Sequence, residues 1–271
     1  MSSLPFQVIA FDLDDTLLRD DLTISERTIM TLRRISNLGV QIIPASGRAK
    51  LSMKSFVEQI GCASLYISCN GAETWDATSH ELLHAEQFST QLGQEIAAFG
   101  KAHQVYAQTY DGPFFFYNEE SVWAEKYAAS SMLTGKYVGD LEAYIQEPRS
   151  KILMMASEEK ISSMLQEARQ RFQGRVSVTC SKPYFLEFNP LRATKGIALS
   201  WAAEHLGIPL DRFLAFGDSL NDLSMLQAVG RGVLMSNGRP ELQALCDDGC
   251  GSNQEDGVAA YLESLNWEEK I

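Results

Sequence analysis

The chain has 271 residues, of which 45% are hydrophobic and 21% are charged, and its formal net charge at pH 7 is −12. This composition is that of a soluble globular protein, and the length allows one large α/β domain or a core domain with an insertion. The acidic balance argues against a nucleic-acid backbone or an acidic membrane surface as partner, and no apolar run approaches the ~20 residues that span a bilayer.

The first predicted element is a buried strand at residues 8–11 (VIAF), which leads directly into the acidic segment 12–16 (DLDDT). Carboxylates at a strand end repel one another, so a fold keeps them together where a cation offsets their charge. Mg²⁺ prefers such oxygen ligands and commonly completes its shell with water and phosphate. A simpler interpretation is that Asp12 and Asp15 only stabilise the following turn, because aspartate is common in turns.

A helix is predicted next. Thr23 and Glu26 have the spacing of a capping box, with Thr23 as the N-cap, and apolar residues then recur at helical spacing until Gly39. A strand at 40–44 precedes the turn Ala45-Ser46-Gly47-Arg48. A second helix at 49–60 and a third strand at 65–68 follow, and this alternation predicts βαβ units and a parallel sheet.

The pattern changes after residue ~75, where short aromatic-rich strands replace the βαβ rhythm. They are predicted at 104–110, 114–117, 151–156, 176–180 and 184–188, with helices near 89–100, 121–129 and 158–172. The charged run 81–86 before them is interpreted as a solvated hinge. These segments indicate an α+β module inserted into the first domain.

The βαβ rhythm resumes at Thr194, which is predicted to cap a helix at 195–205. A buried strand at 213–216 then leads into the segment 217–222 (GDSLND), again at a strand end. A strand at 232–235 and a helix at 258–265 complete this part of the chain.

Four polar segments therefore follow strand ends or open helices, where an open parallel sheet binds its ligands. Acidic and amide side chains suit a metal ion, a hydroxyl and free backbone N–H groups suit phosphate oxygens, and a lysine neutralises a phosphate. The candidates are Asp12, Asp14, Ser46, Gly47, Lys195, Asp218, Asn221 and Asp222.

The segments DLDDT, ASGR, ATKG and GDSLND resemble the four motifs of the haloacid dehalogenase (HAD) superfamily of phosphohydrolases. The position of the insert, together with CNGA at 69–72 and DGVA at 256–259, resembles the Cof-type subfamily. The resemblance implies an α/β fold, with a Rossmann-like parallel-sheet core at residues 1–82 and 189–271 and an inserted α+β cap domain at 83–188.

The resemblance also implies roles for the candidate residues. Asp12 would be the nucleophile that forms an aspartyl-phosphate, and Asp14 the general acid and then the general base. Mg²⁺ would be held by the carboxylates of Asp12 and Asp218 and by the backbone carbonyl of Asp14. The phosphoryl oxygens would be held by Ser46, Gly47, Lys195 and Asn221, with Asp222 orienting Lys195 or metal-bound water.

Two further residues lie beside these motifs. Arg48 either contacts the substrate or pairs with an acidic residue of the core, and the sequence does not decide between them. Asn70 is expected to fix a turn near the site rather than to touch the substrate.

The predicted function is a Mg²⁺-dependent phosphatase of small phosphate monoesters, sugar phosphates first, with flavin mononucleotide and pyridoxal phosphate as further candidates. The partner is a small phosphorylated metabolite, with no nucleic acid or membrane, and the oligomeric state stays open. Five cysteines, an odd number, favour reduced thiols and a cytoplasmic protein. The alternatives are a phosphotransferase or phosphomutase that uses the same intermediate, and a non-catalytic sensor of a phosphorylated metabolite.

Overall fold

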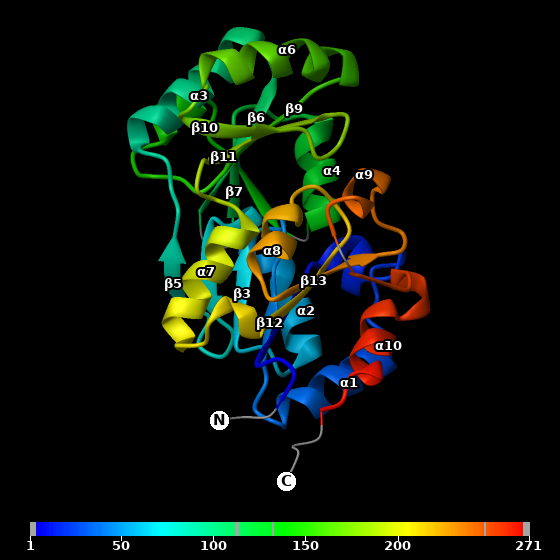
Figure 1. Ribbon diagram of the computed structural model, residues 1–271. Helices are drawn as coiled ribbons and strands as arrows, with labels where there is room; N and C mark the ends of the chain where they lie inside the picture. The colour runs from blue at the N-terminus through cyan, green and yellow to red at the C-terminus, as the bar shows by residue number, and fades with distance from the viewer. Residues whose placement is uncertain (1–3, 112–113, 132, 247, 268–271) are drawn as a thin grey trace. The chain divides into compact units, whose positions relative to one another are not determined.

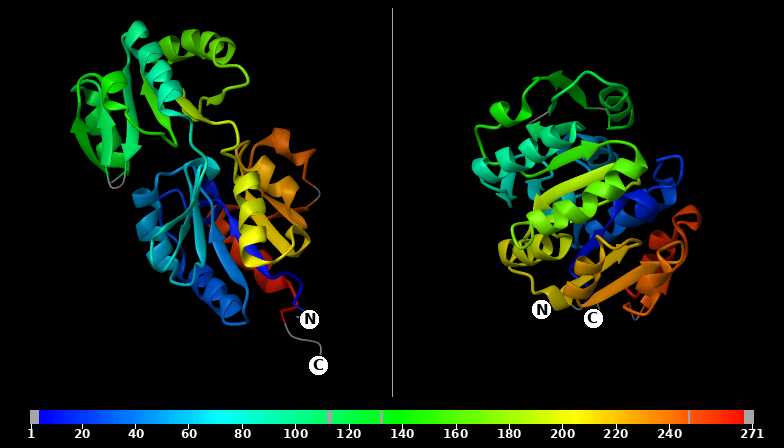
Figure 2. Two further views of the ribbon diagram at one scale, coloured as in Figure 1. Left: turned by 90° about the vertical axis from the view of Figure 1, so that its left-hand side faces the viewer. Right: turned by 90° about the horizontal axis from the view of Figure 1, so that it is seen from above.

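A computed structural model describes residues 4–111, 114–131, 133–246 and 248–267. The chain divides into two compact units, and Figures 1 and 2 show the elements of both. The first unit contains residues 1–47, 53–84 and 194–271, and the second contains residues 48–52 and 85–193. The predicted domain boundaries at 82/83 and 188/189 lie two and five residues from these divisions, and the ends of the predicted core fall outside the described residues.

The first unit is built on a five-stranded sheet in the order β14-β13-β12-β1-β2. Every neighbouring pair in it is parallel, with Val8 of β1 opposite both Phe213 and Gln41. The parallel core and the mixed α/β class predicted from the sequence are confirmed. The strands are β1 (Val8–Phe11), β2 (Gln41–Pro44), β12 (Phe213–Gly217), β13 (Arg231–Met235) and β14 (Asp248–Cys250).

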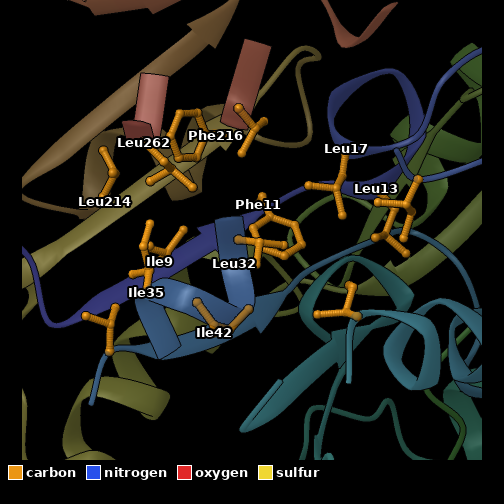
Figure 3. Packing of buried hydrophobic residues seen from close by; sticks show 14 of the residues in the cluster. Ile9, Phe11, Leu13, Leu17, Leu32, Ile35, Ile42, Leu214, Phe216 and Leu262 are labelled. Atoms are coloured by element: carbon orange, nitrogen blue, oxygen red, sulfur yellow. The ribbon is translucent and has the colours of Figure 1, made fainter. Parts of the chain in front are cut away.

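Helices cover both faces of this sheet, because successive side chains of each buried strand point to opposite faces. Ile9 and Phe11 pack with α1 and α10 on one face (Figure 3), whereas Val8 and Ala10 pack with α7 and α8 on the other. The helices are α1 (Glu26–Ser36), α2 (Lys50–Ile60), α7 (Lys195–Leu206), α8 (Leu223–Ala228), α9 (Pro240–Gln243) and α10 (Gly257–Ser264). Short turns of other helix types are η1 (Leu13–Leu17), η2 (Cys69–Gly71), η3 (Leu210–Arg212) and η4 (Asn253–Glu255).

The predicted cap of α1 is wrong. Ser25, not Thr23, is the N-cap, and its side chain accepts a hydrogen bond from the backbone N–H of Thr28. The backbone N–H and the hydroxyl of Thr23 both donate to Asp21 Oδ1 instead, at 3.0 and 2.6 Å. A local turn around Asp21 therefore competes for Thr23, and the helix begins at Glu26.

The third predicted strand is present, and it also pairs with a strand that was not predicted. β3 (Leu65–Ser68) belongs to a separate three-stranded sheet with β4 (Glu73–Asp76) and β5 (Leu82–Ala85), and it pairs antiparallel with β4. On its other side β3 lies beside β2: Ala45 and Ile67 form a parallel bridge, and the N–H groups of Ser64 and Ser46 donate to the carbonyls of Ile42 and Ile67, each at 2.9 Å. The run interpreted as a solvated hinge at 81–86 contains β5, none of its residues is buried, and the division between the two units, after His84, falls within it.

The second unit is a six-stranded sheet in the order β10-β11-β9-β6-β7-β8, antiparallel except for the β7–β8 pair. Helices α3 and α6 pack on one face, against Ile152 and Phe188, and α4 packs on the other, against Phe115. The strands are β6 (Tyr106–Asp111), β7 (Phe114–Tyr117), β8 (Thr134–Tyr137), β9 (Ile152–Met155), β10 (Val176–Thr179) and β11 (Phe185–Pro190). The helices are α3 (Thr90–His103), α4 (Val122–Ser131), α5 (Leu141–Tyr144) and α6 (Glu158–Arg171).

Within the described residues, every helix is too short or too polar to cross a bilayer.

Candidate active site

The candidate site lies at one edge of the parallel sheet, where two adjacent central strands end. β1 ends at Phe11 and is followed by Asp12, and β12 ends at Gly217 and is followed by Asp218. The backbone N–H of Asp12 donates to the carbonyl of Phe216 at 3.0 Å, which holds the two strand ends together. Parallel pairing thus brings carboxylates from distant parts of the sequence to one place.

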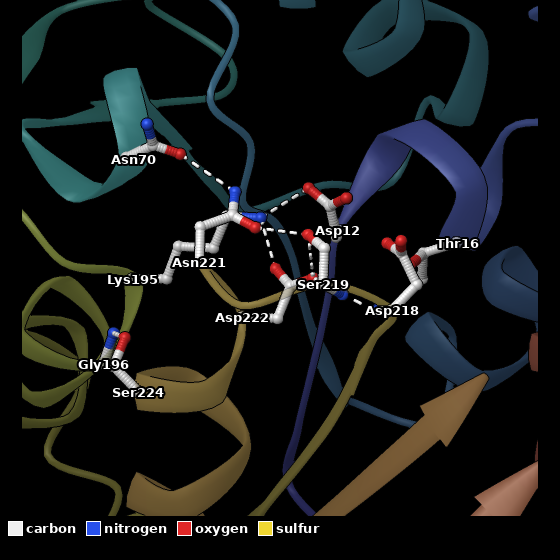
Figure 4. Close-up of polar contacts among 10 residues, drawn as sticks. All are labelled: Asp12, Thr16, Asn70, Lys195, Gly196, Asp218, Ser219, Asn221, Asp222 and Ser224. Atoms are coloured by element: carbon white, nitrogen blue, oxygen red, sulfur yellow. Dashed lines mark hydrogen bonds and ion pairs between the residues drawn. The ribbon is translucent and has the colours of Figure 1, made fainter. Parts of the chain in front are cut away.

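A lysine ammonium links two of the carboxylates. The side chain of Lys195, the first residue of α7, is fully buried, and its Nζ donates to Oδ1 of Asp12 and to Oδ1 of Asp222. Figure 4 shows these three side chains pointing toward one another. Thr194 places the lysine, because its side chain caps the helix by accepting from the N–H of Ile197 at 3.2 Å.

The second oxygen of Asp222 is used within its own loop. Oδ2 accepts hydrogen bonds from the backbone N–H groups of Asp218 and Ser219, each at 3.0 Å. Asp222 is fully buried and is therefore held on one side by Lys195 and on the other by the backbone. These contacts fit a supporting residue, which positions Lys195 and the loop that carries Asp218.

The carboxylates form a group that suits a divalent cation. One oxygen from each of Asp12, Asp218 and Asp222 lies within 4.8 Å of the others, and all three residues are buried. Thr16 donates to Oδ1 of Asp218 at 3.0 Å, which leaves the second oxygen of that carboxylate for another partner. Three buried carboxylates against one ammonium leave excess negative charge, and hard oxygen donors match the ligand preference of Mg²⁺.

Burial changes the proton affinity of these groups. It raises the pKa of Asp12 well above its usual range, Lys195 opposes the shift, and Asp222 adds to it. Burial, followed by repulsion from Asp222, raises the pKa of Asp218 to about 7. Burial alone would lower the pKa of Lys195, but Asp12 and Asp222 outweigh it and raise that pKa. The ammonium of Lys195 is therefore charged at neutral pH.

A second group of polar residues lies in the turn after β2 and in the loop after β12. Ser46 is buried, and its backbone N–H donates to the carbonyl of Ile67 at 2.9 Å. Asn221 donates from Nδ2 to Oδ1 of Asn70 at 3.0 Å, so two loops that lie far apart in the sequence meet here. Gly47 adjoins Asn70, since a Cβ placed on it would lie 2.8 Å from Asn70 Oδ1.

The remaining two predicted residues have different settings. Asp14 lies in η1 and is half-buried, but its carboxylate is not in the close group of three. The metal ligand predicted for Asp14 is its backbone carbonyl, whereas the close group contains side-chain oxygens only. Arg48 belongs to the second unit, where its Nη1 donates to Ser52 Oγ at 3.2 Å.

Three residues of the site were missed or undervalued in the sequence. Thr16 bonds Asp218, and Ser219 bonds Asp222 through its N–H and Asn221 through its hydroxyl. Asn70 bonds Asn221 directly. Thr16 and Ser219 lie inside the motifs DLDDT and GDSLND, and this position could have indicated that they belong to the site. Asn70 precedes a glycine, a pair typical of tight turns, which gave no indication of its partner.

Known proteins resemble this chain along most of its length. A family model described as haloacid dehalogenase-like hydrolase matches residues 9–262. The 5-amino-6-(5-phospho-D-ribitylamino)uracil phosphatase of Bacillus subtilis is 28% identical over 97% of this chain and 98% of its own length. The HMP-PP phosphatase of Cronobacter sakazakii is 30% identical over 87% of this chain and 86% of its own.

Solved structures show the same fold along nearly the whole chain. A haloacid dehalogenase-like hydrolase from Bacteroides thetaiotaomicron superposes with a TM-score of 0.88 at 28% identity, over 95% of this chain and 98% of its own. A Thermotoga maritima protein superposes with a TM-score of 0.89 at 25% identity, over 98% of this chain and 100% of its own.

Proposed function

Because the chain belongs to the family of haloacid dehalogenase-like hydrolases, we propose that it is a Mg²⁺-dependent phosphatase of small phosphate monoesters that works through an aspartyl-phosphate. Both relatives described above are named phosphatases of phosphorylated small molecules, which supports hydrolysis of phosphoric monoesters. One observation carries the proposal: Asp12, at the end of β1, is bonded to the buried ammonium of Lys195 within a group of three carboxylates.

The proposed reaction has two displacements at phosphorus. An oxygen of Asp12 attacks the phosphorus of the ester, the phosphorus–oxygen bond to the alcohol breaks, and Asp14 gives the leaving alcohol its proton. Asp14 then takes a proton from water, whose oxygen attacks the same phosphorus. Phosphate leaves, and the carboxylate of Asp12 is restored. We propose that Mg²⁺, held by Asp12, Asp218 and the backbone carbonyl of Asp14, offsets the repulsion between nucleophile and phosphate.

The donors around Asp12 support a phosphoryl site. An ammonium has three N–H donors, and two of those on Lys195 are directed to Asp12 and Asp222, which leaves one for a phosphoryl oxygen. The side-chain amide of Asn221 has two N–H donors, and one of them is directed to Asn70. With the hydroxyl of Ser46 and the N–H of Gly47, these groups supply the positioning and charge neutralisation that phosphoryl transfer needs.

We propose sugar phosphates as the first class of substrate and the predicted cap, residues 83–188, as the part that selects the leaving group. The name of the Bacillus subtilis relative includes a phosphorylated ribityl chain, which supports a polyhydroxylated leaving group. A net charge of −12 and five cysteines with no disulfide among them support a small-metabolite enzyme of the cytoplasm over a protein that binds nucleic acid.

The test is phosphate release from a panel of esters, with Mg²⁺ or with a chelator. The panel contains sugar phosphates, 5-amino-6-(5-phospho-D-ribitylamino)uracil, HMP-PP, flavin mononucleotide and pyridoxal phosphate. We expect Mg²⁺-dependent turnover that falls by about 10³-fold or more in Asp12→Asn. The matched control is Asp211→Asn, the same change at an exposed aspartate of the same unit, which should keep wild-type activity. Turnover that survives in Asp12→Asn, or in the chelator, would refute the mechanism.

A further inference from the structure

The turn Cys69–Gly71 between β3 and β4 has an unusual backbone. Its three residues all have positive φ angles, +51° at Cys69, +59° at Asn70 and +103° at Gly71. Glycine adopts this conformation freely and asparagine tolerates it, but for most residues it costs roughly 1–2 kcal/mol. A turn of this kind persists only where its surroundings hold it, and it tends to occur at functional sites.

The surroundings are segments of the candidate active site. The backbone N–H of Asn70 donates to the carbonyl of Ser46 at 3.0 Å. A Cβ placed on Gly71 would lie 2.2 Å from the carbonyl oxygen of Thr194, so the turn packs directly against the start of α7, which carries Lys195. The turn therefore contacts both the segment after β2 and the helix that presents the lysine.

The side chain of Asn70 makes the third connection. Its Oδ1 accepts from Nδ2 of Asn221 at 3.0 Å, and Oδ1 of Asn221 accepts from the hydroxyl of Ser219. The amide of Asn221 is thus fixed at both ends, with one N–H left over. The same Oδ1 of Asn70 lies 2.8 Å from the place that a Cβ on residue 47 would take, so the amide of Asn70 also packs closely against Gly47.

We propose that Asn70 is a positioning residue for the phosphoryl group: it orients the remaining N–H of Asn221 and packs its amide against Gly47 beside it. The inference rests on the proposed function, because it assigns both groups to the phosphoryl site. Asn70 itself forms no bond with the substrate. A residue that only stabilised the turn would affect the melting temperature and not the binding of phosphate.

Asn70→Gly is the sharpest variant, because glycine keeps the positive φ and removes only the amide. The readout is the Kd of inorganic phosphate, measured calorimetrically with Mg²⁺ present, for the wild type, Asn70→Gly, Asn221→Ala and the double variant. We expect Asn70→Gly to weaken binding about 10-fold, the size of one hydrogen bond to a charged group. In the Asn221→Ala background the same change should weaken it by less than about 3-fold, because the two residues act as a unit.

The matched control is Leu22→Gly, the same substitution at an exposed residue of the same unit that also has a positive φ, of +64°. It should keep the wild-type Kd. The inference is overturned if Asn70→Gly binds phosphate as the wild type does, or if the two changes are additive. Phosphate binding needs no turnover. A wild type that binds phosphate but hydrolyses no ester would therefore refute the proposed function, and the Kd values of the four proteins would still test the role of Asn70.

Discussion

Replacing Lys195 with methionine should destabilise the protein severely, because it removes a fully buried cation bonded to two buried carboxylates. Methionine has a similar shape, so the change removes the charge and its hydrogen bonds while largely keeping the volume. Removing one partner of a buried ion pair costs about 3–5 kcal/mol, because the remaining charge is left unpaired. Here two carboxylates lose their partner, although either can take up a proton, so we expect about 4 kcal/mol at pH 7.

The assay is thermal unfolding followed by calorimetry, in chelator so that no metal replaces the lysine. At about 2–4 °C per kcal/mol for a protein of this size, the melting temperature should fall by roughly 8–16 °C. The matched control is Lys101→Met, whose ammonium pairs with Asp140 at 2.8 Å on the surface, where its side chain is 62% exposed. Its melting temperature should stay within experimental error, because exposed pairs contribute little.

A second variant keeps the reasoning testable if Lys195→Met does not fold. In Lys195→Met/Asp222→Asn one of the unpaired carboxylates becomes neutral, so we expect a recovery of part of the lost stability, with no recovery of activity. The charge argument would be refuted by a melting temperature of Lys195→Met equal to that of Lys101→Met, or by a double variant less stable than the single one.

Three further changes test other parts of the structure. Gly71→Ala should lower the free energy of unfolding by about 2–5 kcal/mol in denaturant titrations, because a Cβ would meet the Thr194 carbonyl at a φ of +103°. Lys151→Met should cost roughly 3–5 kcal/mol, since its buried ammonium lies 2.6 Å from a carboxylate oxygen of Glu187, and Lys151→Met/Glu187→Leu should regain most of that stability. Burial raises the pKa of the Cys250 thiol to about 12, so very little of it is thiolate at pH 8. When the protein is treated with an alkylating reagent at pH 8 and the modified cysteines are identified by mass spectrometry, Cys250 should stay unmodified until the protein unfolds.

The sequence predicted best the strands that form a short, nearly unbroken apolar run. The strands at 8–11, 65–68 and 114–117 have the bounds that were predicted, because continuous apolar runs are identified by composition alone. Short strands such as β8 were missed, since Thr134–Tyr137 contains a glycine and is mostly exposed at the edge of its sheet. The partner of a strand was harder still: β3 was found, but its antiparallel pairing with β4 depends on tertiary contacts that local periodicity does not encode.

In the candidate site, too, some contacts could be predicted from the sequence and others could not. Parallel strands bring their carboxyl ends to one edge whatever the loops do, so the meeting of Asp12 with Asp218 could be expected from the strand order alone. The roles assigned to these residues stay predictions until they are measured. The bond between Asn70 and Asn221 joins residues 151 positions apart through the orientation of two amide groups, and no periodic pattern reports such an orientation.

The structure shows the partners of individual N–H donors, whereas the sequence could assign a role only to a whole residue. Lys195 was predicted to hold phosphate, yet two of its three N–H donors are directed to Asp12 and Asp222, and Asn221 likewise directs one of its two to Asn70. Each residue therefore offers the phosphoryl group a single donor whose direction the other bonds fix. A substitution at Lys195 or Asn221 removes both the donor to the phosphoryl group and the bonds that orient this donor, so its effect does not distinguish the two losses. Changing Asn70, which holds the donor without being one, separates the two.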